Sequence, residues 1–135
     1  MVTKTAKKAK TQDVRSELEG MSLSVVIPAF NEEGAVQATI EDVRTAMDPL
    51  GIPYEIIVVD DGSEDNTLEI ARQTGVIVDS NQVNTGYGAA LKRGVKRAQY
   101  EYVAILDADG TYPPYYLPSM LAMCRDQDMV VGDRG

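Results

Sequence analysis

The stretch YVAILDADGTYP at residues 102–113 decides the fold expected for this chain. A run of residues that favour β-structure leads to Asp107 and Asp109, and Gly110 and Pro113 then end the strand. Residues i and i+2 of an extended chain point to the same side, so the two carboxylates can converge at the carboxyl end of the strand. Two negative charges held this close favour a cation between them. Oxygen ligands without a nearby His or thiolate favour Mg²⁺ or Mn²⁺ over Zn²⁺, and the alternative interpretation is a pair of solvated loop aspartates.

The bulk composition is that of an ordinary soluble domain. The chain has 135 residues, of which 44% are hydrophobic and 25% are charged, enough for one domain with a modest core. Its net charge of −8 argues against a nucleic-acid partner, since phosphate backbones are bound by clustered Lys and Arg. The single cysteine, Cys124, lies in an apolar helical pattern and is assigned to the core. No apolar run is long enough to span a bilayer, so the sequence predicts a cytoplasmic protein.

The first residues differ in composition from the rest of the chain. Residues 1–21 are polar and basic, which predicts a flexible tail. Attraction of this tail to an anionic membrane surface is a second interpretation. The folded domain is expected over residues 22–135.

Strands and helices are expected to alternate strictly along the domain. The expected strands are 23–27, 54–59, 76–78, 102–106 and 129–132. The expected helices are 33–47 and 65–73, one after the polar loop 81–88 with Leu91, Val95 and Ala98 facing inward, and one with a stripe of Leu117, Met120, Leu121 and Cys124. Such alternation specifies an α/β fold with parallel strands joined by right-handed crossovers.

Three of the expected loops directly follow strands and carry acidic residues: 28–33, 60–65 and 107–113. In a parallel sheet these loops lie along one edge, so their carboxylates can gather in one crevice. Helix capping is the simpler alternative for any single loop, and Ser63 and Asp65 fit either interpretation.

Four stretches together resemble the inverting, family-two glycosyltransferases of the GT-A fold. They are VIPAFNEE (26–33), VVDDGSEDNT (58–67), NTGYGAA (84–90) and LDADGTYPP (106–114). The resemblance covers residues 22–135 and is strongest to the branch that includes dolichyl-phosphate mannose synthase and polyprenyl-phosphate sugar transferases. It implies a Rossmann-like fold that binds a nucleotide-diphosphate sugar, with a mostly parallel sheet and helices on both faces.

The resemblance also implies roles for individual residues. The donor-binding positions are Pro28, Ala29, Asn31, Glu32, Asp60, Asp61, Gly86, Gly88, Lys92, Asp107 and Arg134. Asp60 and Asp61 would hold the base or ribose, because a carboxylate accepts hydrogen bonds from both a ring N–H and a hydroxyl. Gly86 and Gly88 would let the backbone come close to the ligand.

A metal site is implied in the same way. Asp107 and Asp109 would hold a Mg²⁺ or Mn²⁺ ion that bridges the donor's diphosphate. Lys92 would face the donor, and Arg134 would pair with phosphate. Polyprenyl-phosphate mannose synthases commonly carry a Gln two places after the second Asp, as a further metal ligand, where this sequence has Thr111.

The activity implied is the transfer of a hexose from a UDP- or GDP-sugar, with inversion, to a polyprenyl phosphate or another glycan or lipid acceptor at the inner face of the membrane. The chain ends where the family's acceptor-binding half would begin, so the sequence predicts a truncated, donor-binding half. A catalytic base is expected beyond Gly135, or is not needed where the acceptor is an ionised lipid phosphate. A catalytically incomplete nucleotide-binding or assembly module is the main alternative.

Two other enzyme classes were weighed against the same motifs. The DADGT segment also matches the nucleophile loop of haloacid-dehalogenase-type phosphatases, but that chemistry needs a lysine and an acidic pair on later strands. A Rossmann dehydrogenase is less compatible, since Gly86 and Gly88 are not followed by a third glycine at the required place.

Overall fold

The computed structural model describes residues 18–110 and 113–124. In this part of the chain, parallel strands form one sheet in the order β3-β2-β1-β4. The strands are β1 (Leu23–Ala29), β2 (Tyr54–Asp61), β3 (Ile77–Asn81) and β4 (Tyr102–Ile105). The helices are α2 (Val36–Met47), α3 (Thr67–Gln73), α4 (Tyr87–Arg97) and α5 (Leu117–Cys124), with short 3₁₀ turns η1 (Asp48–Leu50) and η2 (Pro114–Tyr116). The predicted α/β architecture is confirmed.

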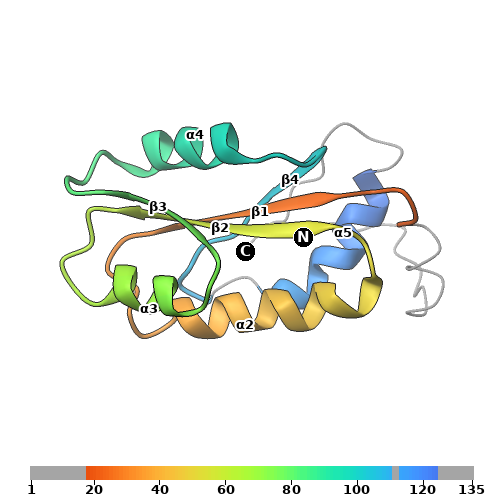
Figure 1. Cartoon of the computed structure of the whole chain (residues 1–135), viewed down its shortest axis with the longest axis horizontal. Helices are drawn as coiled ribbons and strands as arrows, with labels where there is room; N and C mark the ends of the chain where they lie inside the picture. The colour runs from red at the N-terminus through yellow and green to blue at the C-terminus, as the bar shows by residue number, and fades with distance from the viewer. Residues whose placement is uncertain (1–17, 111–112, 125–135) are drawn as a thin grey trace.

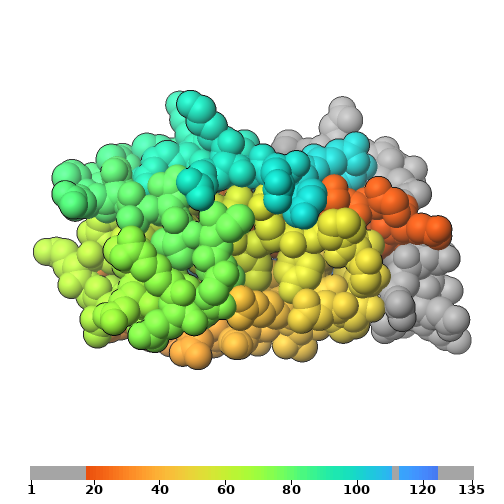
Figure 2. Space-filling view, viewed as in Figure 1, coloured from red at the N-terminus to blue at the C-terminus, as the bar shows by residue number. Residues whose placement is uncertain are grey.

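The sheet lies between two helical layers (Figure 1). Helix α4 covers one face, and α2, α3 and α5 cover the other. Figure 2 shows the atoms of α4 (teal) along one side of the molecule and those of α2 (orange to yellow) along the other. Every residue of β1 is buried, which explains why this strand is a nearly continuous apolar run.

Helix α4 lies very close to the sheet because small residues face it. Ala90 and Gly94 are its buried residues, and Ala90 packs with Val26 and Val59. The prediction that Val95 faces inward is wrong, since 47% of Val95 is exposed. The apolar pattern misled here because a glycine carries no hydrophobic signal, although the absence of a side chain is what permits the close contact.

Several helices and strands begin or end a few residues away from their predicted boundaries. Helix α2 begins at Val36 instead of residue 33, because the N–H groups of Ala35 and Val36 both donate to the carbonyl of Glu32 in a preceding turn. Helix α3 likewise begins at Thr67 instead of residue 65. Strands β2 and β3 both run further than expected, because their backbones stay paired as far as Asp61 and Asn81.

The start of the folded domain is also earlier than predicted. Leu18 is 0% exposed and Met21 is 4% exposed, and both belong to the core. Leu18 and Met21 are therefore packed against the domain, so the folded part begins at or before Leu18. Leu18 stands between Glu17 and Glu19, so the sequence gives little signal that it is buried.

Some predictions lie outside the described residues: the basic segment before residue 18, Thr111, the strand at 129–132, and Arg134. Among the residues that are described, no helix is both long enough and apolar enough to cross a bilayer.

Strand β1 separates from β4 before it ends. Its pairing with β4 reaches Val26, where the N–H of Leu106 donates to the Val26 carbonyl at 2.9 Å. Its pairing with β2 continues to Ala29. Pro28 has no N–H with which to extend a strand pair. The end of β1 and the segment after β4 are therefore free to line an opening between them.

We predict that Gly94→Ala destabilises the protein. A Cβ at this position would lie 2.3 Å from Val26 Cγ1 and 3.1 Å from Val59 Cγ2. Overpacking of this kind costs about 1–3 kcal/mol, more than the gain of up to about 1 kcal/mol from replacing a helical glycine. Urea unfolding measures the difference. Gly88→Ala on the same helix is the control, since nothing lies within 4 Å of its Cβ position. Equal stability of the two variants would contradict the prediction.

Candidate functional site

A cavity of about 400 Å³ lies at the carboxyl edge of the sheet. It is formed by residues that end or follow β1, end β2, follow β4, and precede or begin α4. Its lining consists of Pro28, Ala29, Phe30, Glu32, Asp61, Asn84, Gly86, Tyr87, Ala90, Asp107, Ala108 and Asp109. Segments far apart in the sequence therefore meet at the place where parallel α/β sheets bind ligands.

The structure brings most of the predicted site residues to this cavity. Those that line it are Pro28, Ala29, Glu32, Asp61, Gly86, Asp107 and Asp109. Asn31, Asp60, Gly88 and Lys92 are described but are not among the lining residues. Gly88 and Lys92 belong to α4, Gly88 in its first turn and Lys92 further along.

Sequence reasoning did not single out five of the lining residues: Phe30, Asn84, Tyr87, Ala90 and Ala108. All five fall inside the stretches that carried the family resemblance. Phe30 is 44% exposed and Tyr87 is 56% exposed, which is high for aromatic side chains. For Tyr87 the available signal was an aromatic residue between two glycines, Gly86 and Gly88.

The loops after β1 and β2 are tied to each other. The Asn31 N–H donates to Ser63 Oγ at 2.9 Å, and the Glu64 N–H donates to Asn31 Oδ1 at 2.8 Å. The Glu32 N–H donates to Thr67 Oγ1 at 2.8 Å. Asn31 adopts a left-handed backbone with φ of 53°, a conformation that asparagine tolerates better than most residues. Its described contacts hold the loop, and Glu32 is thereby fixed at the rim of the cavity.

Asp65 connects the loop before α3 to the loop after β1 and does not line the cavity. Its Oδ1 accepts from the Thr67 N–H at 2.9 Å, an Asx turn that leads into α3, whose N-cap is Asn66. Its Oδ2 accepts from the Glu33 N–H at 3.2 Å, which ties it to the loop after β1. Burial opposes ionisation of Asp65, but these hydrogen bonds outweigh it and hold its pKa below the ordinary value. Asp65 therefore supports the site from outside the cavity.

Asp60 and Asp61 point to opposite faces of the sheet. Val58 packs in the core under α2 and Val59 in the core under α4, and side chains alternate along a strand. Asp60 is 2% exposed, and its Oδ1 has no hydrogen-bond partner among the described residues. Asp61, on the α4 side, reaches the cavity. Neighbouring aspartates thus have different environments.

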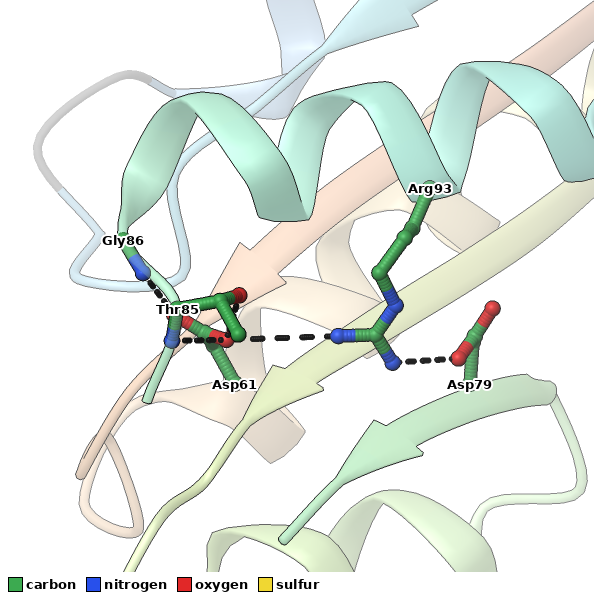
Figure 3. A network of polar contacts seen from close by, with 5 residues as sticks. All are labelled: Asp61, Asp79, Thr85, Gly86 and Arg93. Carbon is green, nitrogen blue, oxygen red and sulfur yellow. Dashed lines mark hydrogen bonds and ion pairs between the residues drawn. The ribbon is translucent and has the colours of Figure 1, made fainter. Parts of the chain in front are cut away.

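The carboxylate of Asp61 binds the loop before α4 (Figure 3). Oδ1 accepts from the Thr85 N–H at 2.9 Å and from its hydroxyl at 2.7 Å, and Oδ2 accepts from the Gly86 N–H at 2.8 Å. Arg93 Nη1 lies 3.9 Å from Oδ1. Burial opposes ionisation, but the hydrogen bonds from Thr85 and Gly86 and the charge of Arg93 outweigh it, so the pKa of Asp61 lies below its ordinary value. Asp61 is an anion held by backbone donors.

Negative charge accumulates on the other side of the cavity. Burial, and after it the charges of Asp109, Asp65 and Asp107, raise the pKa of Glu32. The hydroxyl of Tyr87 donates to Asp107 Oδ1 at 3.0 Å. Repulsion among carboxylates of this kind is relieved when a cation binds between them.

The donor set fits a cation that is shared with a phosphate ligand. Within residues 18–110 and 113–124, no group of three or more acidic, cysteine or histidine side chains is arranged to hold a metal. Mg²⁺ is typically bound through one or two carboxylates together with substrate phosphates and water. Asp107 and Asp109 supply two carboxylates at a cavity that can admit such a ligand.

The parallel sheet and the acidic cavity at its carboxyl edge define an α/β protein with a cavity at the edge where such sheets bind ligands. The chain belongs to glycosyl transferase family 2, whose sequence profile matches residues 24–135. This membership overturns the phosphatase interpretation of the DADGT segment. The similarity to solved glycosyltransferase structures described below confirms the GT-A fold.

Two curated relatives and one solved structure illustrate the similarity. The low-salt glycan biosynthesis hexosyltransferase Agl6 of Haloferax volcanii is 43% identical over 115 residues, covering 84% of this chain and 27% of the relative. The undecaprenyl-phosphate 4-deoxy-4-formamido-L-arabinose transferase of Aeromonas hydrophila is 37% identical over 116 residues, covering 82% of this chain and 36% of the relative. The chain thus spans about a third of the length of these relatives.

The structural neighbour is glucosyl-3-phosphoglycerate synthase from Mycobacterium tuberculosis, solved in complex with Mn²⁺, UDP and glucosyl-3-phosphoglycerate. The two structures superpose with a TM-score of 0.71 at 27% sequence identity. The match covers 88% of this chain and 45% of the neighbour.

We predict that Asp61→Asn destabilises the protein by about 2–4 kcal/mol near neutral pH. The N–H groups of Thr85 and Gly86 now donate to two carboxylate oxygens, and in the variant one of these oxygens is replaced by an NH₂ group that cannot accept. The folded-state pKa of Asp61 is lowered, so its stabilisation is present above the ordinary value of 3.8 and is lost as the pH falls through the folded-state pKa. The stability gap between wild type and variant should therefore narrow below that pH. Urea unfolding across pH measures it, with the exposed Asp42→Asn as control. A gap that does not change with pH would contradict the prediction.

Proposed function

We propose that this chain is the donor-binding part of a glycosyltransferase that moves a hexose, with inversion, from a UDP- or GDP-sugar to a polyprenyl phosphate or another glycan or lipid acceptor. The observation that carries the proposal is the cavity that joins Asp107 and Asp109 with the glycine-containing loop before α4. Its volume of about 400 Å³ falls in the usual ligand-site range of about 300–1,000 Å³. The relative named as an undecaprenyl-phosphate sugar transferase and the neighbour solved with UDP and Mn²⁺ support the choice of substrates.

Asp107 and Asp109 are the residues that would hold a Mg²⁺ or Mn²⁺ ion at the donor's diphosphate. When bound, the cation supplies positive charge that neutralises the leaving nucleoside diphosphate. Glu32 lines the same cavity, and its pKa is raised first by burial and then by the charges of Asp109, Asp65 and Asp107. The Mn²⁺ in the structural neighbour supports a divalent cation in this position.

The nucleoside would lie against the segment after β1. Pro28 and Ala29 at the end of β1 line the cavity together with Glu32, and the neighbouring Asn31 fixes the loop that carries Glu32. Asp60 does not line the cavity, so its assignment to the base or ribose requires the nucleoside to reach its buried Oδ1, which lacks a hydrogen-bond partner among the described residues. A nucleoside N–H or hydroxyl would satisfy that oxygen.

The diphosphate would lie at the start of α4. The N-terminus of a helix favours anions, because its first N–H groups and its dipole both point at the ligand. Gly86 precedes the helix and Gly88 lies in its first turn, so neither places a side chain against the ligand. Lys92 and Arg134 are proposed to pair with phosphate oxygens.

The chemistry requires one bond to form and one to break. An acceptor oxygen attacks the anomeric carbon, and the bond from that carbon to the diphosphate oxygen breaks on the opposite face, which inverts the configuration. A polyprenyl phosphate is already ionised at neutral pH and needs no base, whereas a hydroxyl acceptor needs one. A polyprenyl acceptor would place the reaction at a membrane surface.

A nucleotide-binding or assembly module without turnover is the second candidate. The observation that favours it is that the match covers only 27% of the Haloferax volcanii relative and 36% of the Aeromonas hydrophila relative. The two candidates share the nucleotide site and differ in whether the sugar is transferred. Product formation from a UDP- or GDP-sugar and a polyprenyl phosphate separates them.

Calorimetry with UDP, GDP and CDP, each with and without Mn²⁺, tests the shared site. At least one nucleotide is expected to bind more tightly when Mn²⁺ is present. Failure of all three nucleotides to bind under either condition would overturn the proposal.

We predict that Asp109→Ala removes the Mn²⁺-dependent part of nucleotide binding and leaves the fold intact. Asp109 is exposed, so its loss should not disturb the core, while one of the two proposed metal ligands disappears. Calorimetry measures binding, and circular dichroism checks the fold. Asp42→Ala, an exposed acidic residue on α2, keeps wild-type binding as the matched control. An unchanged diphosphate affinity in Asp109→Ala would contradict the metal assignment.

A further inference from the structure

The loop that precedes α4 is held tightly against the end of β2. The carboxylate of Asp61, at the end of β2, accepts hydrogen bonds from the N–H groups of Thr85 and Gly86. Gly62 packs against the same loop so closely that a Cβ there would lie 2.6 Å from Asn84 N and 2.7 Å from Val83 C. Gly62 also has a positive φ of 78°, which disfavours any other residue. The loop therefore has little freedom to move relative to β2.

Arg93 connects α4 to both β2 and β3 (Figure 3). Its Nη2 donates to Asp79 of β3, and its Nη1 lies 3.9 Å from Asp61 Oδ1. The side chains of Arg93 and Asp61 are only 25% and 5% exposed, so solvent screens this attraction weakly. Helix α4 is thus anchored near its middle by charge and at its start by the clamped loop.

Both carboxylate oxygens of Asp61 accept hydrogen bonds from the loop before α4. Oδ1 and Oδ2 together accept from two backbone N–H groups and one hydroxyl, which is most of the acceptor capacity of a carboxylate. Asp61 lines the cavity, but its geometry suits holding the loop better than binding a base or ribose.

The residue placed by this arrangement is Tyr87. It directly follows the clamped Gly86 and is the first residue of α4. Its side chain lines the cavity, and its hydroxyl donates to Asp107 Oδ1 at 3.0 Å. A hydrogen bond to one carboxylate oxygen restricts rotation of the whole group, so it sets the direction of both oxygens of Asp107.

We propose that Tyr87 is a positioning residue for the metal-binding carboxylate of Asp107, and that Asp61 and Arg93 act through the loop and helix that place it. The inference rests on the proposed function, because it requires that Asp107 bind the cation. Hydrogen-bond partners of metal-binding carboxylates orient these ligands, and their removal typically weakens metal binding by about 10- to 100-fold. Tyr87 has no assigned contact with the reacting atoms.

Tyr87→Phe tests the proposal, since it removes only the hydroxyl. The measurement is the gain in affinity for UDP, GDP or CDP, whichever binds wild type, when Mn²⁺ is added. We expect the gain to fall by about 10- to 100-fold, while affinity in EDTA and the thermal midpoint stay at wild-type values. Tyr115→Phe is the matched control, because Tyr115 is also an exposed tyrosine and does not line the cavity.

The outcomes separate this inference from the proposed function. If wild type shows the Mn²⁺-dependent gain and Tyr87→Phe keeps it in full, the role of Tyr87 is overturned and the proposed function stands. If Tyr87→Phe loses affinity equally with Mn²⁺ and in EDTA, the hydroxyl contacts the nucleotide, and the positioning role is also overturned. If wild type shows no gain with any of the three nucleotides, the proposed metal site fails and the inference fails with it.

Discussion

The parallel pairing of β1 with β2 on one side and β4 on the other is the constraint on which the site depends. It aligns the carboxyl ends of these strands, so the segments that follow them meet at one edge. The pairing with β4 stops at Val26, whereas the pairing with β2 continues to Ala29. The cavity lies where β1 and β4 part, with Ala29 on one side and Ala108 on the other. Backbone pairing, and not any one side chain, thus decides where a ligand can bind.

The carboxylates around the cavity fall into two groups with different partners. Asp61 is stabilised as an anion by backbone donors and by Arg93, which lowers its pKa. Glu32 instead experiences burial and the charges of Asp109 and Asp107, which raise its pKa. The first arrangement builds a rigid support, and the second favours the binding of a positive charge. A cation-bridged diphosphate beside a fixed glycine loop suits both, and it agrees with membership of glycosyl transferase family 2.

The alternation of strands and helices and the gathering of acidic loops could be predicted from the sequence, because they follow from apolar runs and from the position of strand ends. Contacts that depend on how closely a helix approaches the sheet could not be predicted from the sequence. Gly94, which faces the sheet, looks like a neutral position in a helical pattern, so Val95 was assigned inward instead. The roles of Asp61 and Tyr87 depend on how the start of α4 lies against β2 and β4, which no local pattern records. Strand alternation did contain the signal that Asp60 and Asp61 face opposite sides.

The most direct test of the account is a crystal structure of the chain grown with Mn²⁺ and the nucleoside diphosphate that binds it, with the manganese located by anomalous scattering. The account predicts a manganese peak coordinated by the carboxylates of Asp107 and Asp109, with the diphosphate in the cavity between the end of β1 and the start of α4. A peak at any other place, or a nucleotide bound outside this cavity, would contradict it.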